Sequence, residues 1–255
     1  MSEVKYKRVL LKLSGEALQD TQDHQILQAT TLKNAACAVK KMVDKGVQVA
    51  IVVGAGNIWR GKMADSIGID PATADYMGML GTMINSLALQ SAIEQEGIAC
   101  RVLSSISATQ VAEPYIRRRA IRHLEKGRVI IFAGGTGNPF FTTDTTAALR
   151  AKEVQCDVIL MAKNGVDGVY SADPNVDPTA KLLKHLTYRE LLQKELKVMD
   201  STAVSLLKDS NVQIRVFNMS DMDNFMKVIT GSDLGTTITT VSYTHLRAHE
   251  TLSDL

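Results

Sequence analysis

The stretch RVIIFAGGTGNPFFTTDTTAALRA, residues 128–151, decides the fold of this chain. Its apolar run Val129–Ala133 predicts a buried strand, and a glycine-rich loop at Gly134–Pro139 follows directly. Thr143–Asp144 are typical helix-starting residues, so a helix is expected to continue through Arg150. A strand, a glycine loop and a helix in this order present free backbone N–H groups that favour an anion such as phosphate.

A tight turn between strand and helix, with ordinary capping, would also explain the glycines. The segment adds hydroxyl groups at Thr136, Thr142 and Thr143 and a carboxylate at Asp144. These are more donors and charges than a turn requires. We therefore favour ligand binding over a purely structural turn.

The composition allows one large α/β domain or two small ones, because 45% of the 255 residues are hydrophobic. Lys and Arg number 29 and Asp and Glu 27, so the net charge of +2 does not indicate a nucleic-acid or membrane partner. The aromatic content of 5% argues against a base-stacking surface.

Cysteine usage indicates a reducing compartment. Cys37, Cys100 and Cys156 are widely spaced in apolar segments, which is typical of buried reduced thiols in a cytosolic protein. The N-terminal apolar run is too short for a secretory signal, and no segment approaches the ~20 apolar residues of a membrane helix. We therefore expect a cytoplasmic protein with no membrane segment.

Strands and helices alternate along the chain, which predicts an α/β fold with a mostly parallel sheet covered on both faces. Apolar runs predict strands at Arg8–Leu13, Val47–Val53, Arg101–Ser104, Val129–Ala133, Asp157–Lys163, Ile214–Met219 and Thr236–Val241. Further helices are expected at Ile26–Lys45, Asp75–Glu96, Glu113–Lys126 and near Met222–Thr230, with two short helices within Leu182–Ser210. No linker or repeat divides the chain, so we expect a single domain with two halves.

Polar residues and glycines follow several predicted strands. Lys12 ends the first strand, Gly54–Asn57 form a second glycine loop with Arg60 nearby, and Lys163 ends a later strand. Such strand ends share one edge of an open parallel sheet, where ligands bind. Taken singly, Lys12 is more often a solvated strand end, and Asp75 is more often a helix cap.

The residue types in these loops suit phosphoryl transfer. No histidine or cysteine of the chain falls within them, which argues against thiol chemistry, histidine acid–base chemistry and a zinc site. Phosphoryl transfer depends mainly on holding and neutralising oxygens in line. A phosphate acceptor, with a second pKa of ~6, is already anionic at pH 7 and needs no general base.

Five motifs together resemble the bacterial uridylate kinases, a family of the amino acid kinase superfamily, over about residues 6–240 in order. Of these motifs the GTGNPFFTTD string is specific to that family, whereas the lysine strand and glycine loop are shared across the superfamily. The motifs are Lys12–Leu18, Gly54–Gly61, Asp75–Leu80, Gly135–Asp144 and Val166–Pro174.

The resemblance implies a three-layer αβα sandwich that transfers the γ-phosphoryl group of ATP to UMP, giving UDP for pyrimidine nucleotide synthesis. It also implies Mg²⁺ bound with ATP, a homohexamer and UTP as an inhibitor, with GTP as a possible activator. It places one kinase domain at residues 1–240, with the N-terminal half mainly on the acceptor side and the C-terminal half mainly on the ATP side.

Site roles carried over by the resemblance fall into three groups. Catalytic roles fall to Lys12, Arg60 and Asp144, with Lys163 as a further candidate. ATP would be bound by Lys12, Leu13, Ser14, Gly15, Gly56, Arg60, Asn164, Tyr170 and Asp173. UMP would be bound by Ala55, Asp75, Thr136, Gly137, Asn138, Pro139, Phe140, Phe141, Thr142 and Thr143, and no residue is assigned as a protein ligand of a metal.

Three departures from the family pattern leave questions open. Ala55 interrupts the family's glycine triplet, so its methyl group must fit next to UMP. Asp20–Gln25 lack the glycines of members activated by GTP. Residues 241–255 have no counterpart, and we hypothesise that they lie outside the kinase fold and are perhaps not native. A sister kinase acting on a carboxylate or carbamate, and a non-catalytic sensor of UMP or UTP, are the alternatives.

Overall fold

The computed structural model describes residues 3–19, 25–163, 165–174, 176–196 and 198–240. Within these residues, one sheet has the strand order β4-β3-β5-β2-β1-β6-β10-β11-β9. Its strands are β1 (Arg8–Leu13), β2 (Gln48–Val53), β3 (Cys100–Ser104), β4 (Glu113–Pro114), β5 (Val129–Ala133), β6 (Val158–Lys163), β9 (His185–Thr187), β10 (Gln213–Asn218) and β11 (Thr236–Thr239). Every neighbouring pair is parallel except β10 with β11, so the predicted mostly parallel sheet is confirmed.

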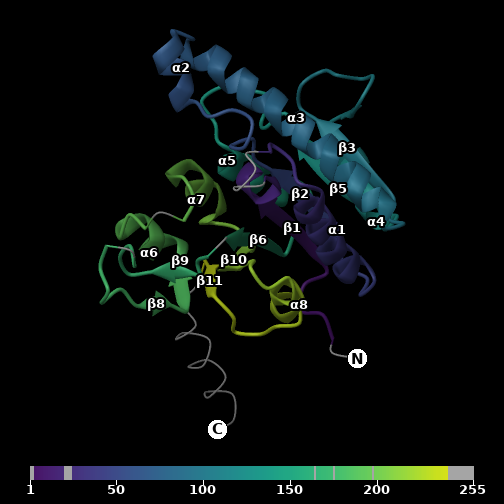
Figure 1. Ribbon diagram of the computed structural model, residues 1–255. Coiled ribbons are helices and arrows are strands. Elements are labelled where there is room, and N and C mark those ends of the chain that lie inside the picture. The colour runs from purple at the N-terminus through teal and green to yellow at the C-terminus, as the bar shows by residue number, and fades with distance from the viewer. Residues whose placement is uncertain (1–2, 20–24, 164, 175, 197, 241–255) are drawn as a thin grey trace.

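Helices cover both faces of the sheet, which confirms the three-layer αβα sandwich (Figure 1). One face packs against α1 (Ala29–Val43), α3 (Pro71–Gln95) and α8 (Asp223–Ile229). The other packs against α4 (Arg117–Glu125), α5 (Thr143–Glu153), α6 (Tyr188–Gln193) and α7 (Ser201–Leu207). The short helix α2 (Lys62–Ile67) and the start of α3 project beyond the sheet (Figure 1).

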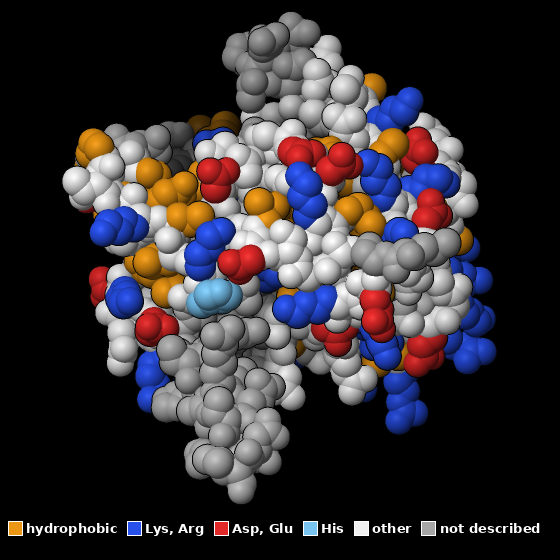
Figure 2. Space-filling view, turned by 90° about the horizontal axis from the view of Figure 1, so that it is seen from below, with side chains coloured by type: hydrophobic (Ala, Val, Ile, Leu, Met, Phe, Trp, Pro, Cys, Tyr) orange, Lys and Arg blue, Asp and Glu red, His pale blue; other side chains and the backbone are white. Residues whose placement is uncertain are grey.

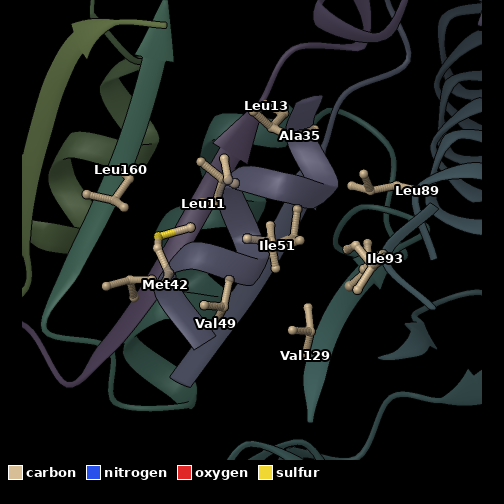
Figure 3. Close-up of a cluster of buried hydrophobic side chains, with 14 of the residues drawn as sticks. Leu11, Leu13, Ala35, Met42, Val49, Ile51, Leu89, Ile93, Val129 and Leu160 are labelled. Atoms are coloured by element: carbon tan, nitrogen blue, oxygen red, sulfur yellow. The ribbon is translucent and has the colours of Figure 1, made fainter. Parts of the chain in front are cut away.

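The central strand β1 shows why both layers are needed. Successive side chains of a strand point to opposite faces, so Leu11 and Leu13 pack toward α1 and α3, whereas Leu10 packs toward α5. Figure 3 shows Leu11 and Leu13 together with Met42 of α1. Burying such a side chain contributes about 1.5–3 kcal/mol, and a strand that is apolar on both faces requires cover on both.

The predicted start of α3 is wrong. The helix begins at Pro71, not at Asp75, because proline is favoured at the first helical position. Asp70 caps the helix, since its carboxylate accepts hydrogen bonds from the N–H groups of Ala72 and Thr73. Asp75 therefore lies inside the helix, and its carboxylate is not needed as a cap.

Two other segments differ from the prediction. Glu113–Pro114 form β4 beside β3, so α4 begins only at Arg117; the residue before a proline is restricted to extended backbone. The segment Leu182–Ser210 does contain two short helices, but it starts with β8 (Leu182–Leu183) and β9. Strand β8 pairs with β7 (Val169–Tyr170) in a small second sheet. The sequence prediction also missed α2.

The surface and two of the three cysteines agree with the expectations from the composition. No helix in the described part of the chain is long and apolar enough to cross a membrane. On the face seen in Figure 2, Lys and Arg side chains are interspersed with Asp and Glu. Cys100 and Cys156 are buried free thiols, and Cys37 is a partly exposed one.

Candidate active site

The sheet topology brings the predicted strand ends together. β1 lies between β2 and β6, with Lys12 paired in register with Val52 on one side and Met161 on the other. The loop that follows β2 therefore lies on one side of Lys12, and Lys163 at the end of β6 lies on the other. This edge is where open α/β sheets bind ligands.

An ion pair joins β1 to α5. The Lys12 Nζ atom lies 2.7 Å from Asp144 Oδ1, and the two side chains are 14% and 20% exposed. Asp144 is in the first turn of α5, directly after the glycine-rich segment. The ammonium group predicted for phosphate chemistry is thus held against the first turn of the helix that follows the second glycine loop.

A pocket of about 460 Å³ opens beside Lys12, and both positively and negatively charged side chains line it. It is lined by Lys12, Ser14, Glu16, Ala17, Gln19, Arg60, Met161, Ala162, Lys163 and Val166. The cations Lys12, Arg60 and Lys163 face a common space of a size suited to phosphate groups.

The end of β1 with the residues that follow it (12–16) and the loop after β2 (54–60) form what we call the glycine cradle. Gly15 lies so close to the second loop that a Cβ atom would come within 2.7 Å of the Gly56 nitrogen and 2.8 Å of the Gly54 oxygen. Backbone thus packs directly on backbone. Only glycine fits at position 15.

Asn85 of α3 holds the glycine cradle in place. Its side chain is completely buried, and Nδ2 donates to the Gly54 oxygen at 2.7 Å and to Asn57 Oδ1 at 2.8 Å. The sequence analysis did not identify Asn85. The sequence signal that could have identified Asn85 is its polar side chain at a buried position of a helix.

The side chain of Arg60 packs against the glycine cradle. Its Nε donates to the Gly56 oxygen at 3.1 Å, and its Nη2 pairs with Glu16, a residue that the sequence analysis did not assign to the site. The Arg60 side chain is 60% exposed. The planar guanidinium group therefore remains accessible for a phosphate ligand.

Residues 134–144, here called the threonine loop, connect β5 to α5. Gly134, Gly135 and Gly137 have φ angles of 75°, 58° and 85°, which L side chains rarely adopt. The Gly134 N–H donates to Thr82 Oγ1 at 2.9 Å, and Ser105 Oγ donates to the Gly135 oxygen at 3.0 Å. Neighbouring side chains therefore fix the path of this loop.

Asp75 contacts the threonine loop from α3. Its Oδ2 accepts a hydrogen bond from the Phe140 N–H at 2.7 Å, and Phe140 has an unusual φ of 70°. A non-glycine residue in the left-handed region needs such support. The aromatic rings of Phe140 and Phe141 are exposed, at 74% and 48%.

Asp200, which the sequence analysis did not single out, anchors the end of the threonine loop. Its carboxylate accepts hydrogen bonds from the hydroxyls of Thr142 and Thr145 and from the Ala203 N–H. Burial alone would raise the pKa of Asp200, but these hydrogen bonds outweigh it and lower the pKa. The cap of α5 is thus tied to α7 by a charged group.

Lys163, at the end of β6, is a partly buried cation. Desolvation by burial lowers its pKa, the nearby charge of Lys12 lowers it further, and Asp144 opposes the shift. Its Nζ lies 3.5 Å from the Val198 oxygen. A bound polyphosphate would supply the negative charge that favours the protonated amine.

Some predicted residues lie apart from this pocket. Tyr170 is on β7 and Asp173 follows it, and neither lines the pocket beside Lys12. Asn164, residues 20–24 and the tail 241–255 lie outside the described residues. Their predicted roles therefore stay predictions.

The methyl group of Ala55, which departs from the family's glycine triplet, is accommodated by a glycine of α3. Ala55 is 8% exposed, and a Cβ placed on Gly81 would lie 2.9 Å from the Ala55 Cβ. The methyl group therefore occupies space that Gly81 leaves free. A contact of Ala55 with a nucleotide would have to come from its backbone.

Residues 7–218 match the family model described as the amino acid kinase family. A uridylate kinase of Limosilactobacillus reuteri is 56% identical over 238 residues, which cover 93% of this chain and 99% of that protein. The crystal structure of UMP kinase from Bacillus anthracis has a TM-score of 0.90 and 42% identity, covering 93% of this chain and 97% of its own. That of UMP kinase from Ureaplasma parvum has a TM-score of 0.87 and 36% identity, covering 92% and 99%.

A family model that matches residues 7–218, together with a relative that is 56% identical over nearly its whole length, defines the class of protein. The chain belongs to the amino acid kinase family and, within it, to the uridylate kinases. The resemblance drawn from the five motifs is confirmed.

Proposed function

We propose that this chain transfers the γ-phosphoryl group of ATP to UMP, releasing UDP and ADP. The observation that carries the proposal is the Lys12–Asp144 ion pair at 2.7 Å, placed between the glycine cradle and the threonine loop. The uridylate and UMP kinases named above support this choice of substrates.

The proposed reaction is an in-line displacement. A phosphate oxygen of UMP attacks the γ-phosphorus, the bond from that phosphorus to the β–γ bridging oxygen breaks, and ADP leaves with the negative charge. The UMP phosphate is largely a dianion at pH 7, so no side chain has to remove a proton. Lys12 neutralises charge shared between donor and acceptor, and Asp144 orients the ammonium group.

The substrates divide between the two loops in this proposal. The glycine cradle, with Arg60, binds the ATP phosphates, and the threonine loop, with Asp75, binds UMP. ATP would bring Mg²⁺ with it, and the ion would help to neutralise the phosphate oxygens, as is common at kinase sites. Among the described residues there is no cluster of three His, Cys, Asp or Glu side chains that could hold a metal ion.

Assembly and regulation are further parts of the proposal. Tyr76, Leu80 and Ile84 form an apolar stripe on α3 and are 45%, 52% and 51% exposed. Such a stripe is typical of a surface that a partner covers, and we propose a second copy of this chain within a cytoplasmic homohexamer. UTP, which shares uracil and ribose with UMP, is the proposed inhibitor, and GTP is a possible activator.

A coupled assay of ADP release tests the function. UMP, CMP, dTMP, acetylglutamate and aspartate are each offered with MgATP, and strong turnover is expected with UMP alone. Turnover of an amino acid substrate would instead identify a sister kinase. Binding of UMP without any ADP release would identify a sensor.

A further inference from the structure

Arg150 is a buried cation that the proposed reaction does not use. It lies on α5, downstream of Asp144, and is only 4% exposed. Arginine stays protonated in proteins, and a buried charge is costly unless it is paired and hydrogen-bonded. The contacts of this guanidinium group therefore indicate which role compensates for the cost of burying it.

One side of the guanidinium group is neutralised and enclosed. Arg150 Nη1 lies 2.5 Å from Glu153 Oε2, and the Tyr115 hydroxyl donates to the same oxygen at 2.6 Å. The Arg150 Cζ lies 3.7 Å from the centre of the Tyr115 ring, a cation–π contact. These groups hold the guanidinium in a single position.

The other side of the guanidinium group is connected to the threonine loop by hydrogen bonds through one serine. Arg150 Nη2 donates to Ser105 Oγ at 2.8 Å, and Ser105 Oγ donates to the Gly135 oxygen at 3.0 Å. A serine hydroxyl has one hydrogen, and arginine can only donate. The hydrogen bond from Arg150 therefore leaves the serine hydrogen directed at Gly135.

This connection sets the orientation of one peptide group. A trans peptide is planar, so fixing the Gly135 C=O toward Ser105 points the Thr136 N–H in the opposite direction. The threonine loop also packs directly on the backbone of Ser105, since a Cβ placed on Gly137 would lie 3.1 Å from the Ser105 backbone carbonyl oxygen. Thr82 fixes the preceding residue independently, through the Gly134 N–H.

We propose that Arg150 and Ser105 are positioning residues for the acceptor: they hold the 135–136 peptide in the orientation that binds UMP, without contacting UMP themselves. The proposal rests on the proposed function, because it assigns the threonine loop to UMP. Loss of either side chain weakens UMP binding and leaves the ATP side of the site unchanged.

The test compares the Michaelis constants of both substrates in Ser105→Ala, Arg150→Met and wild type. Each variant is expected to raise the KM for UMP about 5-fold, the effect of one lost hydrogen bond, with the KM for ATP and kcat within about 2-fold of wild type. Exposed Arg118 on α4 provides a matched control, Arg118→Met, for which no change is expected.

A double-mutant cycle sharpens the test. Ser105→Ala and Arg150→Met together should raise the KM for UMP no more than the stronger single change, because both break one connection. Ser105→Ala combined with Thr82→Val should multiply the single effects, because Thr82 acts on a separate peptide.

Two outcomes overturn the inference while leaving the function intact: an unchanged KM for UMP in Ser105→Ala, or an equal rise of both Michaelis constants. Ser105→Ala keeps its Cβ and should fold, so it carries the test if Arg150→Met does not fold. Failure of the proposed function would be distinct, because the wild-type protein would then release no ADP with UMP.

Discussion

The glycine cradle and the threonine loop meet at the Lys12–Asp144 pair but are held in different ways. In the cradle, backbone packs directly on backbone at Gly15, and the buried side chain of Asn85 adds two hydrogen bonds. In the threonine loop, side chains from other elements hold the backbone, among them Thr82 and Ser105. Backbone atoms in close contact cannot rotate away from an added methyl group, whereas a single substitution can remove one side-chain hydrogen bond and leave the others in place. Changes in the cradle should therefore be severe, and changes around the threonine loop graded.

The largest effect is expected at the point where the two regions meet. Lys12→Ala should lower kcat by about 10²-fold or more, the scale of losing a positioned charge in the transition state. The coupled assay measures it at saturating ATP and UMP. Lys41→Ala is the matched control, since Lys41 also forms a 2.7 Å ion pair but at the surface. A kcat equal to wild type in Lys12→Ala would remove this residue from the mechanism.

The next largest effect is expected inside the cradle. In Gly15→Ala the new methyl group would collide with the backbone at Gly54 and Gly56, which cannot rotate away. We expect a loss of about 1–3 kcal/mol in the free energy of unfolding, measured in urea, together with weakened ATP binding. Gly61→Ala is the control, because nothing lies within 4 Å of the added atom. Equal stability of the two variants would contradict the close packing described.

A smaller effect, confined to UMP, is expected at Asp75. In Asp75→Ala the Phe140 N–H loses its charged acceptor, and Phe140 is left in the left-handed region without support. The KM for UMP should rise about 10-fold, the order of a hydrogen bond to a charged group, with little change for ATP. Asp75→Asn keeps an acceptor oxygen and should lose less. A larger rise in the KM for ATP than in the KM for UMP would contradict the assignment of Asp75 to the UMP side of the site.

The difference between the two regions also explains what the sequence could predict. Lys12 and both glycine loops were identifiable because each follows a strand, and the ends of parallel strands share an edge. Ser105 and Asp200 were not identifiable. Their roles depend on side-chain contacts between segments far apart in the chain, for which no local pattern exists.

The misplaced elements have local causes. Both Asp70 and Asp75 are good helix caps, and only the proline after Asp70 distinguishes the true start of α3 from the predicted one. Strands β8 and β9 span only Leu182–Leu183 and His185–Thr187, too short for the alternation of a strand to be visible. Tertiary pairing, not the local sequence, makes them strands.

The contact between Ala55 and Gly81 lies where the cradle meets α3, and it provides a test by paired substitution. Gly81→Ala gains about 1 kcal/mol of helix propensity but overpacks against Ala55, which typically costs 1–3 kcal/mol. Ala55→Gly removes the obstructing methyl group. The double variant should therefore be more stable than the two single effects predict, as measured by urea unfolding. Simple additivity would mean that the two methyl positions do not touch.

The smallest effect at neutral pH is expected at Lys163, a partly buried cation at the end of β6 that faces the same pocket as Lys12 and Arg60. Burial, and then Lys12, lowers the pKa of this amine below its unfolded value of 10.5. The unfolded chain therefore holds this proton more tightly, so its penalty on folding is full below the folded pKa and is relieved as pH rises from there toward 10.5. Lys163→Met should accordingly be more stable than wild type at pH 7, with the difference shrinking at alkaline pH. The same variant should bind ATP more weakly, because the amine that destabilises the empty site is expected to pair with phosphate oxygens. A stability difference that stays constant from pH 7 to about 10, measured by urea unfolding at each pH, would show that Lys163 titrates no differently in the folded and unfolded chain.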